Sequence, residues 1–390
     1  MKQVGGYNAF IPAPLPPDPP VTMDPELARL LSDADRALGR LDGVATVLPN
    51  PDLFVAMYVR HEAVLSSQIE GTQSSLDDVL QFEINSAGKE LPKDVGEVVN
   101  YVNAMNDGLE RISQLPLSLR LIREIHRRLL TDVRGGERTP GEFRRSQNWI
   151  GPQGSTLANA TFVPPPVHGM QTALDNFEKF LHDTTLPVLI HCGLAHAQFE
   201  TIRPFLDGNG RVGRLLITFL LCERKVLHRP LLYLSLFLKV HRSEYYDRLM
   251  AVRRDGNWEG WLKFFLRGIA EVSQSATETA RAIVNLRETH RQLIGDKLAG
   301  RAAQGLRLLD YLFEQPVVSV PLVEKRLECS FVTANKLVEQ LEELTMVRET
   351  TGWQRNRRYR FDSYLALFDA LAPTGGAPPG DSSATNPPAS

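Results

Sequence analysis

The sequence predicts a mostly α-helical protein that ends in a small domain of helices and a two-stranded wing. Apolar residues recur at helical spacing through much of the chain, and 119–133 has one apolar and one charged face. Glycine and proline interrupt this pattern over 135–167, which predicts a long non-helical connection. Residues 347–361 alternate around Gly352 in the manner of two short strands. A chain of 390 residues is long enough for two or three domains.

Composition and charge exclude several classes of protein. A net charge of −2 argues against a chain that coats nucleic acid along its whole length. The cysteines Cys192, Cys222 and Cys329 include no CxxC pair, so we expect a cytoplasmic protein with neither a disulfide framework nor a structural zinc site. No apolar run approaches ~18 residues, and the N-terminus has no basic stretch followed by an apolar one. We therefore expect neither a membrane span nor a signal peptide.

The first part of the chain is expected to be a strap followed by helices. Residues 1–23 are rich in proline, which predicts an extended strap or a loose tail. An N-terminal helical region then spans 24–115 and opens at Asp24 and Pro25, a good N-cap and first helical residue. Its four helices are predicted to begin at residues 25, 51, 75 and 92, and the second ends before Gly71.

A glycine loop carries the most specific chemistry in the chain. Helices are expected on both sides, over 187–202 and through the apolar run 215–221, with Asp207-Gly-Asn-Gly between them. The two glycines allow positive φ, and backbone N–H groups in such a loop, beside a helix N-terminus, favour phosphate. Arg211 and Arg214 share one face of the first helical turn, where arginine opposes the helix dipole unless it serves a bound anion.

Asp207, at the mouth of this loop, is a hard oxygen ligand suited to a Mg²⁺ ion shared with phosphates. The spacing excludes an EF-hand, because glycine is not at the sixth position and the twelfth position is Thr218 rather than Glu. The chain also has no Walker A motif. By itself, the loop fits a tight helix–loop–helix turn with two surface arginines equally well.

The segment from Phe205 to Arg214 resembles the signature of Fic-domain proteins, His-x-Phe-x-(Asp/Glu)-Gly-Asn-Gly-Arg-x-x-Arg, but Arg203 stands where that family has its catalytic histidine. The family transfers AMP from ATP to a protein hydroxyl. The resemblance therefore implies ATP, Mg²⁺ and a target protein with a Ser, Thr or Tyr hydroxyl. The histidine would be the general base, a role that Arg203 cannot take because a guanidinium keeps its proton near neutral pH.

The same resemblance assigns a role to each residue of the loop. Phe205 would anchor the loop in the core, and Asp207 would hold the metal. Arg203 and Asn209 occupy the catalytic positions. The phosphates would bind to the remaining part of the motif, which comprises Gly208, Asn209, Gly210, Arg211 and Arg214.

A second motif lies at the end of the helix predicted over about 51–70. Ser66 and Glu70 are four residues apart and share a helix face. A carboxylate in the last turn meets the negative dipole end at a cost of about 0.3–1 kcal/mol, so it is usually solvated or paired with a cation. Ser66-x-x-x-Glu70-Gly71 also resembles the inhibitory motif of the Fic class that carries it before the core. There the Glu pairs with the second motif arginine, here Arg214, and obstructs the γ-phosphate.

The Fic core is expected over 116–270. Strands at 148–150 and 160–163 would form a β-hairpin flap, which in the family aligns the target segment by strand addition; an ordinary long connection is the alternative. Tyr245 or Tyr246 is a candidate for an adenine pocket, and a core aromatic is the equal alternative.

The helices around the motif carry further assignments. His191 and His196, upstream of the loop, are interpreted as helix-packing residues. Helices are predicted at 258–269 and 276–298, and the second is polar enough to be a connector over 271–299.

Residues 300–370 resemble a winged helix-turn-helix domain, with helices at 306–313, 321–327 and 331–344 before the wing. Five wing arginines, which could meet phosphates, stand against Glu349 alone: Arg348, Arg355, Arg357, Arg358 and Arg360. The recognition helix offers Thr333, Asn335 and Lys336, but also Glu339, Glu342 and Glu343. A protein-interaction or dimer role is therefore favoured over DNA binding. Residues 371–390 are expected to be disordered.

These features predict a self-inhibited Fic-type AMP transferase that is weak or inactive because of Arg203. Two alternatives remain open, a nucleotide-binding pseudoenzyme that acts through partners and a DNA-binding regulator whose Fic core senses nucleotide. ATP and a hydroxyl-bearing protein, the chain itself included, are the expected partners. A homodimer and DNA are further candidates, and no membrane is expected.

Overall fold

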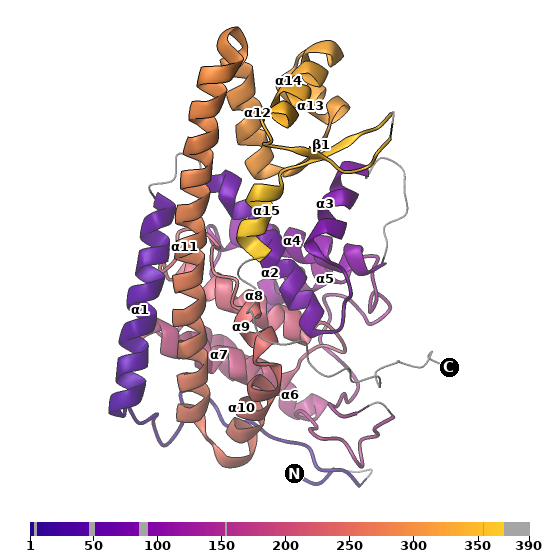
Figure 1. The fold of residues 1–390 in the computed structure, drawn as a ribbon. Helices are drawn as coiled ribbons and strands as arrows, with labels where there is room; N and C mark the ends of the chain where they lie inside the picture. The colour runs from indigo at the N-terminus through magenta and orange to yellow at the C-terminus, as the bar shows by residue number, and fades with distance from the viewer. Residues whose placement is uncertain (4–5, 47–50, 86–92, 153, 354, 370–390) are drawn as a thin grey trace.

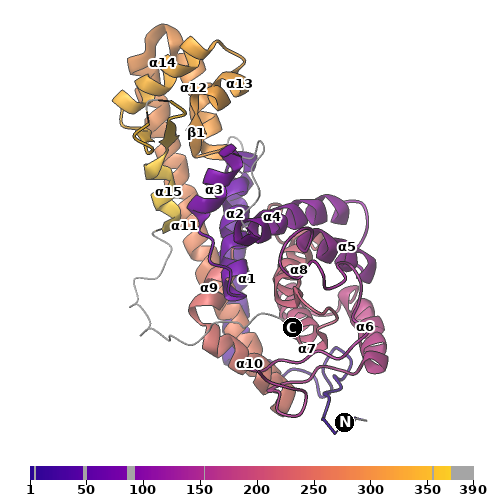
Figure 2. The same cartoon turned by 90° about the vertical axis from the view of Figure 1, so that its right-hand side faces the viewer.

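Helices form nearly all of the regular structure, as the sequence predicts (Figure 1). The computed structural model describes residues 1–3, 6–46, 51–85, 93–152, 154–353 and 355–369. Within them the fold is built around α11 (Trp258–Leu298), a helix of 41 residues that runs along most of the molecule. Helix α1 (Pro25–Thr46) packs along its side, and the small C-terminal domain lies at its far end (Figures 1 and 2).

The break predicted between the helices at 258–269 and 276–298 is wrong, because α11 is continuous. Residues 270–275 contain neither glycine nor proline, the residues that would break a helix. Val272 and Ser273 are buried and continue the apolar face across this stretch. The segment expected to be a separate connector is therefore the second half of a core helix.

The N-terminal helices begin within one residue of their predicted positions. They are α1, α2 (Pro51–Ile69), α3 (Leu76–Asn85) and α4 (Lys93–Ile112). Asp24 caps α1 as expected, since its Oδ1 accepts the N–H of Leu27 at 2.8 Å. Leu27, Ala34 and Leu38 are fully buried on one face of α1.

The proline-rich segment is an extended strap rather than a loose tail. The C=O of Ala13 accepts a hydrogen bond from Nε2 of Gln198 at 2.8 Å, which fastens the strap to α7 (Val188–Ile202). The N–H of Thr22 donates to Glu259 at 2.8 Å, which fastens it to the start of α11.

The core between these parts contains α5 (Leu119–Leu129), α6 (Val167–Leu181), α7, α8 (Asn209–Glu223), α9 (Ser235–Val240) and α10 (Arg242–Asp255). Helix α5 ends four residues before the predicted end at 133, and Asp132 then turns the chain with a φ of 54°. The expected flap hairpin is reduced to one antiparallel bridge between Ile150 and Phe162. Pro152 and the prolines at 164–166 have no N–H to extend the ladder.

The C-terminal domain has helices α12 (Ala302–Glu314), α13 (Val320–Leu327), α14 (Phe331–Glu343) and α15 (Asp362–Asp369). Strands β1 (Val317–Ser319), β2 (Arg348–Glu349) and β3 (Arg358–Arg360) form an antiparallel sheet in the order β1-β3-β2. The wing is therefore present, and β1 and α15 are additions that the sequence analysis missed. None of the helices in the described part of the chain could cross a membrane. The expected disordered tail lies outside the described residues.

Candidate functional site

The glycine loop joins α7 to α8. Helix α7 ends at Ile202, and Arg203 turns the chain in a left-handed conformation with a φ of 44°. Gly208, with a φ of 72°, is the N-cap of α8, which begins at Asn209. The sequence allowed positive φ at both glycines, but Gly210 is helical, so of the two glycines Gly208 alone has a positive φ.

Asn209 closes the loop with its side chain. Its Oδ1 accepts the N–H of Phe205 at 2.9 Å, and its Nδ2 donates to the C=O of Phe205 at 2.8 Å. Phe205 is fully buried, and its ring stacks on that of His126 with the centroids 3.7 Å apart. Both polar ends of the Asn209 side chain are therefore committed to the shape of the loop.

His126 of α5 supports the loop from below, although the sequence analysis did not name it. Its Nδ1 accepts the N–H of Gly141 at 2.8 Å, so its proton is on Nε2, which donates to the C=O of Asp207 at 3.0 Å. Burial lowers the pKa of His126 to about 4, and the ring is therefore neutral. The sequence feature that could have identified His126 is its position on the apolar face of an amphipathic helix.

Arg144 and Asn148, from the long connection after α5, hold the other side of the loop and were also missed. Nε of Arg144 and Nδ2 of Asn148 both donate to the C=O of Arg203, at 3.0 and 3.2 Å. Asn148 also donates to the C=O of Phe205 at 2.9 Å. Burial lowers the pKa of Arg144 to about 10, which leaves it charged at neutral pH. Their sequence context, rich in glycine and proline, gave no periodic signal.

Glu70, just past the end of α2, reaches the first turn of α8. Its Oε1 accepts a hydrogen bond from Nη2 of Arg214 at 2.8 Å. Ser66 accepts from the same guanidinium twice, through its hydroxyl at 2.7 Å and its C=O at 3.0 Å. Burial would raise the pKa of Glu70, but Arg214, Arg211 and Arg203 together outweigh burial and lower the pKa. The pair that the inhibitory motif implies is thus present, with Arg214 2% and Glu70 31% exposed.

The Glu70 carboxylate also lies against the loop backbone. A Cβ on Gly210 would be only 2.1 Å from Oε1 of Glu70, so this position leaves room for the carboxylate only as glycine. Gly210 is the second residue of α8, where unpaired N–H groups carry partial positive charge. The unfavourable interaction of the Glu70 carboxylate with the dipole of α2 is therefore offset by a favourable interaction with the dipole of α8. The carboxylate lies where the N-terminus of α8 would bind an anion.

Asp207 directs its carboxylate toward the connection after α5. Its Oδ1 accepts the N–H of Gly208 at 2.6 Å, and a Cβ on Gly135 would be 2.6 Å from its Oδ2. In the described part of the chain, no group of three or more His, Cys, Asp or Glu side chains could hold a metal ion. A lone carboxylate fits Mg²⁺ that takes its other ligands from water and nucleotide phosphates.

Arg203 and Arg211 are also paired with carboxylates. Nη1 of Arg203 lies 3.0 Å from Oε2 of Glu200, one turn earlier on α7, and Glu200 is buried. Nη1 of Arg211 lies 3.3 Å from Oε2 of Glu97, a fully buried residue of α4. Arg211 and Arg214, the two arginines expected to meet phosphates, thus each have a carboxylate partner from the N-terminal helical region, Glu97 and Glu70.

The histidines near the loop are packing residues, as interpreted from the sequence. Nδ1 of His196 bonds the C=O of Gly213 and its Nε2 bonds the hydroxyl of Tyr245, both at 2.9 Å. His191 likewise bonds a backbone carbonyl. Tyr245 is buried and belongs to the core, whereas Tyr246 is 37% exposed and remains the candidate for contact with a base.

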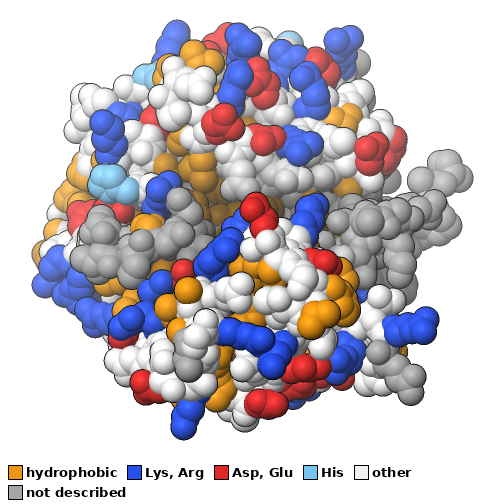
Figure 3. Space-filling model, turned by 90° about the horizontal axis from the view of Figure 1, so that it is seen from above, with side chains coloured by type: hydrophobic (Ala, Val, Ile, Leu, Met, Phe, Trp, Pro, Cys, Tyr) orange, Lys and Arg blue, Asp and Glu red, His pale blue; other side chains and the backbone are white. Residues whose placement is uncertain are grey.

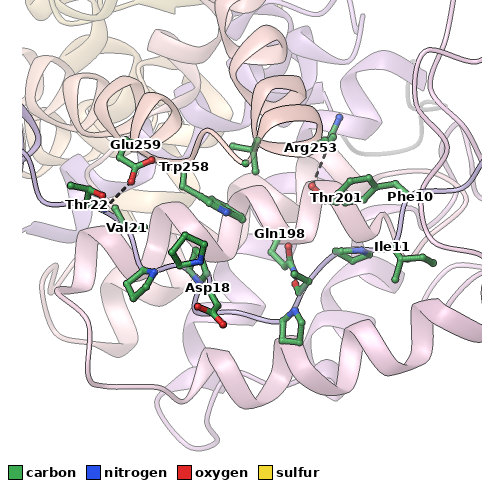
Figure 4. A pocket seen from close by; sticks show the side chains of 18 residues that line it. Phe10, Ile11, Asp18, Val21, Thr22, Gln198, Thr201, Arg253, Trp258 and Glu259 are labelled. Atoms are coloured by element: carbon green, nitrogen blue, oxygen red, sulfur yellow. Dashed lines mark hydrogen bonds between the residues drawn. The ribbon is translucent and has the colours of Figure 1, made fainter. Parts of the chain in front are cut away.

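A cavity of 410 Å³ lies beneath the strap (Figure 4). Strap prolines, Gln198 and Trp258 line it, and none of residues 203–214 does, so it is separate from the glycine loop. Figure 4 shows two hydrogen bonds near its ends, from Thr22 to Glu259 and from Arg253 to Thr201.

Comparison with known families agrees with this geometry. The Fic/DOC family N-terminal model matches residues 28–110, and the Fic/DOC family model matches residues 116–221. The chain contains a Fic domain and the N-terminal domain that accompanies it. The two Fic matches contain both Glu70 and the whole glycine loop.

Named relatives of this Fic protein include two fly enzymes. It is 30% identical over 183 residues to "Protein adenylyltransferase Fic" of Drosophila melanogaster and 31% identical over 183 residues to that of Drosophila virilis. These matches cover 46% of this chain and 32% of each relative, so the chain spans about a third of their length.

Solved structures share the fold. A Fic family protein from Desulfovibrio desulfuricans G20 matches with a TM-score of 0.56 at 19% identity and covers 88% of this chain and 97% of its own. Fic-1 (residues 134–508) from C. elegans matches with a TM-score of 0.50 at 20% identity, covering 67% and 75%.

The C-terminal domain of this Fic protein matches a family described as an HTH DNA binding domain, over residues 306–360. Its wing arginines are largely engaged within the molecule, in the pairs Arg348–Asp362 (2.6 Å), Arg360–Asp77 (3.4 Å), Arg357–Glu339 (3.8 Å) and Arg358–Gln81. On the face seen from above, Lys and Arg side chains are interspersed with Asp and Glu (Figure 3). These contacts weaken the expectation that the wing meets phosphates.

Proposed function

We propose that this Fic protein is a self-inhibited protein adenylyltransferase, which transfers AMP from ATP to a Ser, Thr or Tyr hydroxyl and is impaired by Arg203. The observation that carries the proposal is the Glu70 carboxylate, which bonds Arg214 and lies against Gly210. A carboxylate held at a helix N-terminus by an arginine has the charge and hydrogen-bonding pattern of a bound phosphate. The name of the fly relatives supports the same activity.

The loop residues would divide the work of binding. N–H groups of Asn209 and Gly210 would meet the α- and β-phosphates, joined by that of Gly208 if it leaves the Asp207 carboxylate. Arg211 and Arg214 would meet the outer phosphates. Asp207 would hold Mg²⁺, which when bound would neutralise phosphate charge. Displacement of Glu70 would free Arg214, and this is the proposed basis of self-inhibition.

Arg203 leaves the proposed reaction without a general base at the expected position. The target oxygen bonds to the α-phosphorus, the bond to the bridging oxygen breaks, and pyrophosphate leaves, while the hydroxyl proton passes to a base. Arg203 cannot take that proton, and Glu200 already holds its guanidinium. General-base catalysis typically contributes about 10²–10⁴-fold, so transfer should be slower by roughly that factor.

Transfer of a label from the α-phosphate of ATP to proteins of a cell lysate tests the proposal. Arg203→His should raise transfer about 10²-fold or more, and histidine tolerates the left-handed conformation well. Arg203→Gln, the matched control, removes the cation without supplying a base and should leave transfer low. Glu70→Gly combined with Arg203→His should exceed Arg203→His alone.

Each outcome of this assay bears on one part of the proposal. Equal transfer by the single and double variants would remove the inhibitory role of Glu70. Strong transfer by the unmodified chain that depends on His196 would show that the base is misassigned. ATP binding without transfer in any variant would favour the second candidate, a nucleotide-binding pseudoenzyme, for which Arg203 is the supporting observation. Salt-dependent binding to a specific duplex would favour the DNA-binding regulator.

A further inference from the structure

Glu97 of α4 is a buried carboxylate that three separate segments approach. Its Oε2 accepts the hydroxyl of Thr72 at 2.8 Å and lies 3.3 Å from Nη1 of Arg211. Its Oε1 lies 3.1 Å from Nε of Arg134. Thr72 follows the inhibitory helix, Arg211 belongs to α8, and Arg134 precedes Gly135, which lies against Asp207. Helix α4 packs on α8, which brings the carboxylate to the loop (Figure 2).

Arg211 is held less completely than Arg214. Arg214 uses Nε and Nη2 in three hydrogen bonds to Ser66 and Glu70. Arg211 has one long contact to Glu97, and its buried Nε has no hydrogen-bond partner among the described residues. A buried N–H without a partner is costly, so Arg211 retains capacity for a further acceptor oxygen.

Glu97 itself cannot be displaced as Glu70 can. Its side chain is fully buried in the first half of α4, and three partners surround it, whereas Glu70 is partly exposed beyond a helix end. A fully buried carboxylate between two guanidinium groups fixes their geometry, since moving it would leave an uncompensated buried charge.

We propose that Glu97 is a positioning residue that aims the free Nε edge of Arg211 at the outer phosphates of the nucleotide. This inference rests on the proposed function, because it requires Arg211 to meet those phosphates. Thr72 bonds the same carboxylate and lies in the segment that carries Glu70, so the N-terminal helical region positions both Arg211 and Arg214.

Glu97→Asp tests the proposal in the Glu70→Gly background, by calorimetry with Mg-ATP and with AMP. Aspartate keeps the charge but withdraws the carboxylate by one methylene, so the substitution changes position alone. Mg-ATP affinity should fall about tenfold, as expected when a charge-assisted hydrogen bond is misaligned. AMP has no outer phosphates, and its affinity should change less than about twofold. The loss for Mg-ATP should vanish when Arg211 is already alanine.

Arg134→Gln is the matched control, because Arg134 touches the same carboxylate but is 49% exposed. It should leave both affinities nearly unchanged. If Glu97→Asp does not fold in urea titrations, the isosteric Glu97→Gln gives the same comparison of Mg-ATP with AMP. Unchanged Mg-ATP affinity, or equal losses for both nucleotides, would overturn the positioning role and leave the proposed function intact. Absence of Mg-ATP binding in the Glu70→Gly background itself would overturn both.

Discussion

Glu62 within α2 and Glu70 just past its end have opposite pKa shifts. Glu62 is fully buried, and it accepts hydrogen bonds from the N–H and hydroxyl of Ser235 and from the hydroxyl of Tyr101. Its burial raises the pKa to about 7, from an ordinary value of 4.5. For Glu70, burial acts in the same direction, but Arg214, Arg211 and Arg203 together lower the pKa. The Glu70 carboxylate therefore remains charged at neutral pH while Glu62 titrates there.

Glu62 should make stability depend on pH. Because its pKa is higher in the folded state, the native protein retains a proton between about pH 4.5 and 7 that the unfolded chain releases, so stability falls as pH rises through this interval. Glu62→Gln keeps an acceptor oxygen and removes the titration. The variant should be more stable than the parent at pH 8 by roughly 1–2 kcal/mol, and similar to it at pH 5. Urea unfolding across this range measures the difference, and parallel pH profiles would contradict it.

At the residue scale, the sequence identified the residues of contiguous motifs and missed their supports. The pairing of Glu70 with Arg214 was implied by the resemblance of both motifs to those of the Fic family. His126 and Glu97 lie in ordinary amphipathic helices, where a polar residue on the buried side carries no sign of its partner. Their roles depend on how α4 and α5 pack on α8, which spacing along one helix cannot specify.

At the element scale, helix starts were predicted well and helix ends less well. Starts such as Pro25 and Pro51 carry local capping chemistry, which is readable in sequence. The break predicted between residues 269 and 276 of α11 is absent, because this stretch contains no glycine or proline and Val272 and Ser273 are buried. The predicted flap hairpin was too long, since prolines on both arms limit the pairing to one bridge.

The continuity of α11 predicts opposite effects for two glycine substitutions. Gly295 has open space around the position of a Cβ, so Gly295→Ala should stabilise the protein by about 0.5–1 kcal/mol through helix propensity. A Cβ on Gly268 would lie 2.5 Å from the ring of Phe237, so Gly268→Ala should destabilise it by roughly 1–3 kcal/mol. Chemical denaturation of both variants measures this contrast. Destabilisation by Gly295→Ala would contradict a continuous helix at that position.

At the scale of the whole molecule, helix α2 connects the glycine loop to the C-terminal domain. Phe54 of α2 packs on Phe313 with ring centroids 5.7 Å apart, and Tyr58 packs on Phe368 at 5.4 Å. Arg60 donates to the C=O of Glu314 at 3.2 Å. The sequence presented a separate winged helix, and only tertiary contacts between distant segments show that it braces α2.

The central claim is that the loop is a nucleotide site held closed by Glu70. Calorimetry with Mg-ATP tests it most directly, on the unmodified chain and on Glu70→Gly. Glu70→Gly should bind Mg-ATP at least about tenfold more tightly, because Arg214 loses its carboxylate partner and gains a phosphate. Arg211→Ala should reverse much of that gain, and Asp207→Ala only its Mg²⁺-dependent part. Absence of detectable binding even in Glu70→Gly would contradict the account.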